Sequence, residues 1–223
     1  LLDVTAPPYG ADASGTRDST AAIQQAVKDA YKQEMVCFFP PGQYLVTDTI
    51  LAAQDMSTHD QANCLVGSTA GAQRPRLVLP DNTPGFGNPD RPKPVVWIWT
   101  KPNEKKSQRT GGAVKAGSDN PEDANAAMGF CQVFRGIDIE VGAGNDGAIG
   151  LSLPGAQQCE VADITVEMRS GFAAFGDLPG VNGVIANLKA IGGQYGIYCQ
   201  QSKWPTIIGS EFIGQTTAAI GRM

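Results

Sequence analysis

"RGIDIEV" (residues 135–141) begins a series of short segments that recur through the second half of the chain. The series continues as "ADITVEM" (162–168), "ANLKAIG" (186–192) and "SEFIG" (210–214), and its centres are Ile137, Ile164, Leu188 and Phe212. The intervals between these centres are 27, 24 and 24 residues. Each segment alternates apolar with polar or small residues, which is the pattern of a half-buried β-strand.

A second series lies between these segments. It consists of "GAIGL", "FAAFG", "YGIYC" and "AAIGR", centred on Ile149, Ala174, Ile197 and Ile220 at intervals of 25, 23 and 23 residues. Gly-, Asn-, Asp- and Pro-containing corners separate the two series. Two interleaved series with one period predict a solenoid in which each coil lays its strands on the previous coil.

The N-terminal region predicts one helix over residues 18–33. Ile23, Ala26, Val27, Ala30 and Tyr31 have the spacing of one buried helical face, and Asp18 and Ser19 precede it as N-cap residues. After it, "VCFFPPGQYLVTDTI" (36–50) predicts strand, turn and strand. Because a solenoid exposes backbone and core at its ends, we expect the helix to cap the N-terminal end. We find no equivalent at the other end, and expect the chain to continue beyond Met223.

Composition excludes several classes of function. The 223 residues carry a formal net charge of −5 and no basic stripe, which argues against nucleic-acid binding. No apolar run has the length of a membrane span, and the five cysteines form no CxxC pair that would indicate zinc. The sequence therefore predicts no nucleic-acid partner, no membrane partner and no metal site.

Two segments interrupt the pattern, at residues 80–94 and 101–127, and we assign regular coils to residues 129–223. Loops of this length on a solenoid are typically functional or disordered. Trp97 and Trp99 share one face of a strand, which is either core or groove, and Trp204 lies in a polar corner where exposure is expected. These tryptophans are candidate platforms for sugar rings.

The segments also predict a ladder of acidic side chains on one outer face. Its members are Asp138, Glu140, Asp163, Glu167 and Glu211. Such a ladder could bind Ca²⁺ and support a polysaccharide lyase, with Arg135, Arg169 or Lys189 as the base. Alternatively, it is a solvated face on which acidic and basic side chains offset one another.

The N-terminal motif resembles a known superfamily. "YGADASGTRDSTAAIQQAV" followed by "VCFFPPGQYLV" is similar to the start of pectate-lyase-like parallel β-helix proteins. The matching positions are Tyr9, Gly10, Ala11, Gly15, Asp18, Ser19, Thr20, Ala22, Ile23, Pro41, Gly42 and Tyr44. The block "FCQVFRGIDIEVGAGNDGAIGLSLPGAQQCEVADITVEM" resembles the N-terminal β-helix of glycoside hydrolase family 55, which contains exo-acting β-1,3-glucanases.

That resemblance implies an inverting hydrolysis and a set of site residues. Inverting glycosidases need a protonated carboxyl group and a second group that positions water on the opposite face of the sugar. In the family the acid is a glutamate in a second β-helix, which would lie beyond Met223. The match at "GAQQC" implies that Gln157 positions the water, with Gln158 beside it. Asp177 and Asn182 occupy the family's next polar corner, although the surrounding sequence departs from the family.

Together these observations predict an all-β fold, a right-handed single-stranded parallel β-helix with an N-terminal capping α-helix, spanning residues 1–223. The leading function is a secreted glycoside hydrolase that cleaves a β-1,3-linked glucan from chain ends, without a cofactor. Substrate-binding residues are Gln158, Asp177, Asn182 and Trp204, and a second β-helix domain is expected after residue 223. The alternatives are a Ca²⁺-dependent lyase acting on an acidic glycan and a non-catalytic phage tailspike or glycan-binding shaft.

Overall fold

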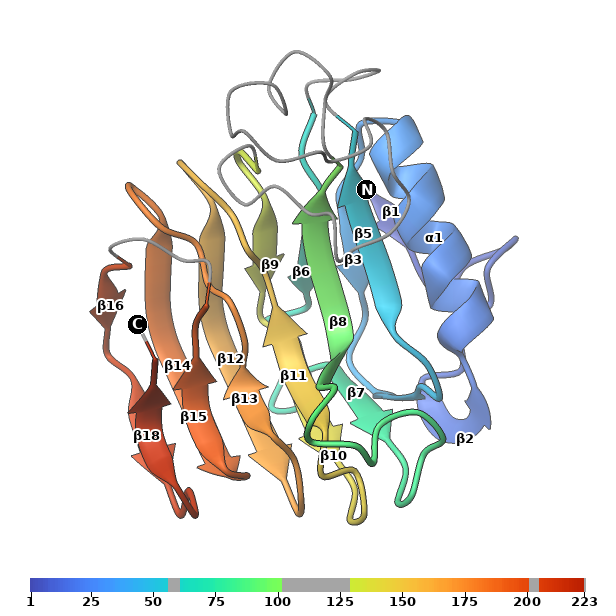
Figure 1. Ribbon diagram of the computed structural model, residues 1–223. Helices are drawn as coiled ribbons and strands as arrows, with labels where there is room; N and C mark the ends of the chain where they lie inside the picture. Colours follow the sequence, from blue (N-terminus) through green and yellow to red (C-terminus); the bar gives the residue numbers. More distant parts are fainter. Residues whose placement is uncertain (56–60, 102–128, 201–204, 223) are drawn as a thin grey trace.

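The computed structural model of the protein describes residues 1–55, 61–101, 129–200 and 205–222. These residues form strands β1 to β18 and one helix, α1, and every strand pairing within them is parallel. The strands make a 12-stranded sheet and a 6-stranded sheet (Figure 1). The all-β, parallel architecture predicted from the repeats is therefore confirmed.

Successive coils place their strands in three columns, two of which share the larger sheet. The first column contains β1 (Leu2–Asp3), β3 (Cys37–Phe39), β6 (Cys64–Gly67), β9 (Val133–Arg135) and β16 (Ile207–Ile208). The second contains β2 (Ser14–Asp18), β4 (Gln43–Leu45), β7 (Arg76–Leu79), β10 (Asp138–Val141) and β17 (Glu211–Ile213). The long strands β12 (Glu160–Met168) and β14 (Val184–Gly192) belong to both columns.

The third column is the smaller sheet. It contains β5 (Ile50–Gln54), β8 (Lys93–Thr100), β11 (Ala148–Ser152), β13 (Ala173–Phe175), β15 (Tyr195–Tyr198) and β18 (Ala218–Gly221). The coils are thus not confined to residues 129–223, because β1 to β8 already occupy all three columns. Lys93 and Pro94, which the sequence placed in an insertion, belong to β8.

Like residues stack in the core between the sheets. Leu77, Ile139, Val166 and Ala190 are paired in successive coils, and all four are buried. Leu65, Phe134, Val161 and Ile185 form a second buried row. Burying an aliphatic or aromatic side chain stabilises a fold by about 1.5–3 kcal/mol, so these rows explain why the apolar positions recur once per coil.

The structure corrects two details of the predicted register. Phe212 pairs with Ala190 rather than aligning with Leu188, because the last step in this sheet is 22 residues rather than 24. Ala173 and Phe175, rather than Ala174, pair with their neighbours, while Ile197 pairs with Ile220 as predicted. In "FAAFG" the two small residues give no hydrophobic signal that would distinguish adjacent registers.

Long strands of the larger sheet change direction at residues in the left-handed conformation. Asp163 (φ 57°) lies inside β12 and Asn187 (φ 55°) inside β14. Gly136 (φ 69°) and Gly209 (φ 61°) occupy the same place in the neighbouring coils, between β9 and β10 and between β16 and β17. Gly, Asn and Asp are the residues that adopt this conformation most readily, so the bend recurs where the sequence supplies them.

Helix α1 (Thr20–Lys32) lies beside β5 at one end of the smaller sheet (Figure 1). Ile23, Ala26, Val27 and Ala30 are buried, as the spacing predicts, and Tyr31 is half-buried. The side-chain amide of Gln24 donates to the Leu51 carbonyl at 2.8 Å and accepts from the Leu51 N–H at 2.8 Å. The helix therefore satisfies backbone groups of the edge strand. Among the described residues, no helix is both long and apolar enough to span a membrane.

The two N-cap residues have different roles. Asp18 accepts from the Thr20 N–H at 2.9 Å, so it satisfies a donor of the first turn. The Ser19 hydroxyl instead accepts from the Asp12 N–H at 2.9 Å and makes no capping bond. Ser19 therefore connects the helix to the preceding turn.

Candidate functional site

The corner that precedes β12 and β14 carries two of the predicted site residues, Gln158 and Asn182, together with Cys131. Cys131, Gln158 and Asn182 are stacked in successive coils, and each has a φ near +60°. The Gln158 N–H donates to the Asn182 carbonyl at 3.3 Å, and the Cys131 thiol donates to Oε1 of Gln158 at 3.3 Å. Gln158 and Asn182 therefore lie side by side, and the hydrogen bond between their backbone groups stabilises this corner.

Gln157 lies beside this ladder with its side chain exposed. Its carbonyl accepts from the Cys131 N–H at 3.2 Å, whereas its side-chain amide makes no hydrogen bond within the described part of the chain. The amide can thus donate to, or accept from, a water molecule or a hydroxyl group. The water-positioning role of Gln157 remains a prediction that this geometry permits.

Asp177 precedes the same corner and is half-buried. Its Oδ1 accepts from the Gln200 N–H at 2.5 Å, and its carbonyl accepts from the Leu153 N–H at 2.7 Å. These bonds join three coils, which gives Asp177 a structural function whether or not it also binds substrate. Trp204, the remaining predicted substrate-binding residue, lies outside the described residues.

The predicted acidic ladder lies on the outer face of the larger sheet, and four of its five members contact cations; Glu167 has no ion pair among the described residues. Arg74 donates to both carboxylate oxygens of Asp138, and Arg76 lies 3.0 Å from Glu140. Lys189 lies 2.9 Å from Glu211. Of the two interpretations of this ladder, the structure therefore shows the one in which basic side chains offset the acidic ones. No three His, Cys, Asp or Glu side chains come together as a metal site in the described ranges.

Asp163, another member of this ladder, contacts two groups that lower its pKa. The Asn187 amide donates to it at 2.9 Å, and Arg135 lies 3.0 Å from its other oxygen. The hydrogen bond from Asn187 and the charge of Arg135 lower the pKa of Asp163 below its ordinary value. An ionised, fully engaged carboxylate accepts protons poorly, so Asp163 is unsuited to act as a general acid.

Sequence reasoning missed Arg74 and Arg76. Together with Gln43, Asp138 and Thr165 they line a pocket of about 440 Å³ on the charged face. Arg76 pairs with Asp138 across the sheet, but the insertion between these residues conceals that register in the sequence. The available signal was the alternation of arginines in "RPRL", which places both side chains on one face of the strand.

Trp97 and Trp99 project from the outer face of the smaller sheet. They pair with Leu51 and Ala53, whereas the intervening Ile98 is part of the buried core. Trp99 is covered and lines a pocket of about 470 Å³ together with Val27 and Tyr31 of α1. The sequence left open whether the shared face of these tryptophans belongs to the core or to a groove. In the structure both tryptophans lie outside the core between the sheets.

The chain matches the model of a protein family described as rhamnogalacturonase A/epimerase, pectate lyase-like, over residues 4–219. No curated protein matches the sequence significantly. ORF18 of Geobacillus virus E2 is similar in structure at 15% identity and a TM-score of 0.49, over 95% of this chain and 42% of that one.

Two further solved structures are more distant. The Agl-KA catalytic domain has 14% identity and a TM-score of 0.37, over 98% of this chain and 43% of that one. The Dettilon tailspike protein (gp208) has 13% identity and a TM-score of 0.33, over 91% and 38%. The chain thus spans about two fifths of the length of these three structures. Similarity at this level says nothing about substrate.

The family match agrees with the N-terminal motif from Tyr9 to Tyr44 and confirms the pectate-lyase-like resemblance. The closer resemblance to glycoside hydrolase family 55 stays a prediction. Because the family model extends over nearly the whole sequence and the strands stack in parallel columns, the chain belongs to the rhamnogalacturonase A/epimerase, pectate lyase-like family.

Proposed function

We propose that this chain is part of a secreted glycoside hydrolase that cleaves a β-1,3-linked glucan from chain ends with inversion. The observation that carries the proposal is the family match over residues 4–219, because the family's description names enzymes of carbohydrate chemistry. The exposed Gln157 amide supports it, since it is available to hold the attacking water. No cofactor is required by this mechanism.

The general acid of the proposed reaction comes from outside residues 1–223. On the charged face Asp138, Glu140 and Glu211 each contact an arginine or lysine, so cations already occupy their carboxylate oxygens. A general acid must instead lie within hydrogen-bond reach of the leaving-group oxygen. We therefore assign it to a second β-helix domain after residue 223.

The same proposal includes two features of the coil. We assign a right-handed path to the chain, because connections between parallel strands of one sheet are right-handed in nearly all proteins. We also assign α1 the role of an N-terminal cap. Its buried face and the two Gln24 hydrogen bonds to Leu51 support this role.

Hydrolysis is tested by incubating the full-length protein, including the proposed second domain, with laminarin, other β-glucans, pectate and alginate, while following reducing ends and the absorbance of unsaturated products. We expect reducing sugar from laminarin without that absorbance. Gln157→Ala should lower kcat about a hundredfold. Gln25→Ala on the exposed face of α1 is the matched control and should leave kcat unchanged.

Other outcomes would replace the proposal. Unsaturated products that disappear on adding a chelator would establish the Ca²⁺-dependent lyase. Binding of a glycan without any cleavage would favour the tailspike or glycan-binding shaft.

A further inference from the structure

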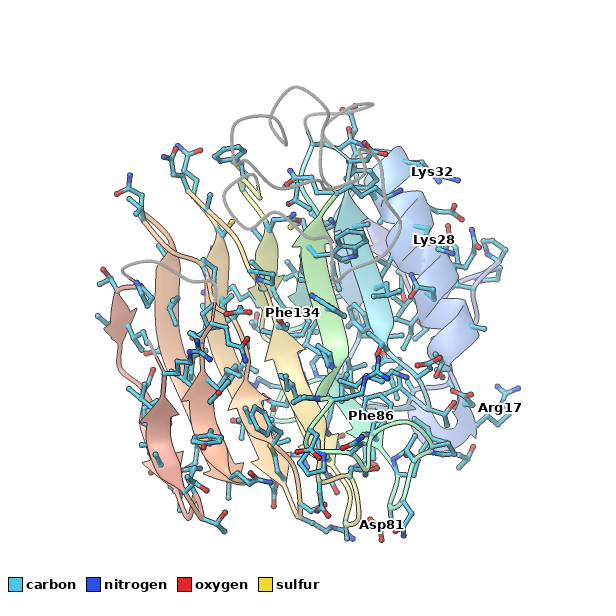
Figure 2. All side chains as sticks on the ribbon, viewed as in Figure 1. Arg17, Lys28, Lys32, Asp81, Phe86 and Phe134 are labelled. Atoms are coloured by element: carbon cyan, nitrogen blue, oxygen red, sulfur yellow. The ribbon has the colours of Figure 1, made fainter. Side chains whose placement is uncertain are left out.

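The loop between β7 and β8 forms a pocket that neither the family match nor the predicted catalytic residues explain. It has a volume of about 620 Å³ and its lining includes Gly85, Asn88, Asp90, Arg91, Lys93 and Trp97. Figure 2 labels Phe86, which belongs to the same loop, near the Lys93 end of β8. This volume is within the range of about 300–1,000 Å³ that is typical of small-ligand sites.

The walls of this pocket are held in place by the fold. Phe86 is fully buried, and its carbonyl accepts from the Gly147 N–H at 2.8 Å. The Thr83 N–H donates to Oδ1 of the buried Asn145 at 2.9 Å. The Lys93 ammonium lies 4.5 Å from the centre of the Phe86 ring and 2.6 Å from Asp48. A loop that is already ordered loses little conformational entropy when a ligand binds.

The lining combines an aromatic ring with unused polar groups. Trp97 is half-buried, and its indole N–H is buried without a hydrogen-bond acceptor in the described residues. Asp90 and Arg91 are exposed, and their side chains make no hydrogen bond or ion pair within the described ranges. The pocket therefore contains an apolar ring face, an indole N–H donor, a guanidinium donor and a carboxylate acceptor.

The charged side chains around the pocket indicate which ligands of this size it prefers. Asp90 offsets Arg91 at the rim, and Asp48 neutralises Lys93. The pocket has no surplus charge of either sign, so it has no electrostatic preference for uronates or phosphates. A neutral sugar ring has an apolar C–H face that can pack on an indole and hydroxyl groups that can use the polar rim.

We propose that this pocket binds a segment of a neutral glycan, with Trp97 packed against one sugar ring and Asp90 and Arg91 hydrogen-bonded to its hydroxyl groups. The inference rests on the proposed function, because that function identifies a glycan as the polymer that the protein binds. It assigns a glycan-binding site separate from the Arg74–Asp138 pocket, which lies on the other sheet.

Isothermal titration calorimetry on the full-length protein, including the proposed second domain, tests the site with neutral oligosaccharides of β-1,3-glucan, β-1,4-glucan and mannan, and with oligogalacturonate as the acidic probe. We expect a neutral probe to bind. Asp90→Ala and Trp97→Phe should each weaken binding at least about fivefold, which corresponds to about 1 kcal/mol. Trp97→Phe retains a ring, and Asp90 lies on an exposed loop, so both variants should fold. Asp146→Ala, on another exposed loop, is the control and should bind as the parent does.

Three results would overturn this assignment: no binding of any neutral probe, equal affinity in the parent and both pocket variants, or tighter binding of oligogalacturonate that Arg91→Ala abolishes. Hydrolysis measured on the same samples separates this inference from the proposed function. Cleavage with an unchanged KM in both pocket variants would support the proposed hydrolase and exclude glycan binding at this pocket. Binding through the pocket without cleavage would support the pocket and exclude the proposed hydrolase.

Discussion

At the scale of single residues, Asp163 and Asn187 combine backbone and side-chain functions. Each adopts a left-handed conformation inside a strand, and the Asn187 amide donates to the Asp163 carboxylate of the preceding coil at 2.9 Å. The bend that separates two columns of the larger sheet thus depends on residues that tolerate positive φ and can also bond one another.

Replacing Asn187 separates the two effects. Asn187→Ala should lower the free energy of unfolding by about 2 kcal/mol, because it loses the hydrogen bond and retains the strained backbone. Asn187→Gly should lose less, because glycine adopts φ 55° without strain. Denaturant unfolding measures both variants, and an equal loss in the two would show that backbone conformation is unimportant at this site.

Asp163 should also make stability depend on pH. Its folded pKa is lowered by the Asn187 hydrogen bond and by Arg135, so its contribution is present above the unfolded pKa of about 4 and is lost as pH falls through the folded pKa. Asp163→Asn should therefore be less stable than the parent at neutral pH, and the difference should shrink in acid. Unfolding across a pH series, with Asp146→Asn as control, measures this; a difference that is constant with pH would contradict it.

At the scale of elements, α1 and β5 show how an exposed strand edge is protected. A free edge offers unpaired backbone groups to other chains. Here one glutamine side chain satisfies both the donor and the acceptor of Leu51, while the apolar face of the helix covers the neighbouring core. Helix and edge strand therefore stabilise one another.

Gln24→Ala should destabilise the protein by about 1–2 kcal/mol and accelerate hydrogen exchange of the Leu51 amide. The neighbouring Gln25, whose amide bonds only Asp29 at 2.9 Å among the described residues, is the matched control. Gln25→Ala should change stability by less than about 0.5 kcal/mol and leave exchange at Leu51 unaltered. Unchanged exchange in Gln24→Ala would exclude the proposed contact.

At the scale of the whole molecule, the two ends of the stack differ. The first coil lies against α1, whereas β16, β17 and β18 pair on one side only within the described residues. Ile208 (59% exposed), Ile213 (39%) and Ile220 (42%) lie on these last strands. Unpaired strand edges with exposed apolar side chains favour association with another surface.

When residues 1–223 are prepared as an isolated segment, we expect it to self-associate through these strands as its concentration rises. Ile208→Lys combined with Ile213→Lys should shift sedimentation towards the monomer, because a charge on an edge strand disfavours pairing. Val184→Lys is the control, since Val184 is 51% exposed but lies on β14, which has neighbours on both sides. Equal sedimentation of all variants would show that this end does not associate.

Local patterns were sufficient to predict the main elements. The spacing of Ile23, Ala26, Val27 and Ala30 predicts a helix, because its period depends only on nearby residues. The recurrence from Ile137 to Leu188 predicts parallel stacking, because each coil must return its apolar positions to the same core. Of the candidate site, the sequence placed Gln158 and Asn182 at polar corners of successive coils, and the structure stacks them.

The sequence by itself determined the repeated strands, the N-terminal helix and the family, since these follow from local period and motif. Only the tertiary structure decided the pairing of Arg76 with Asp138, the outward direction of Trp97 and the pocket beside it. The physical reason is that insertions of any length can separate paired strands. Moreover, alternation shows which residues share a face, but packing decides which face is buried.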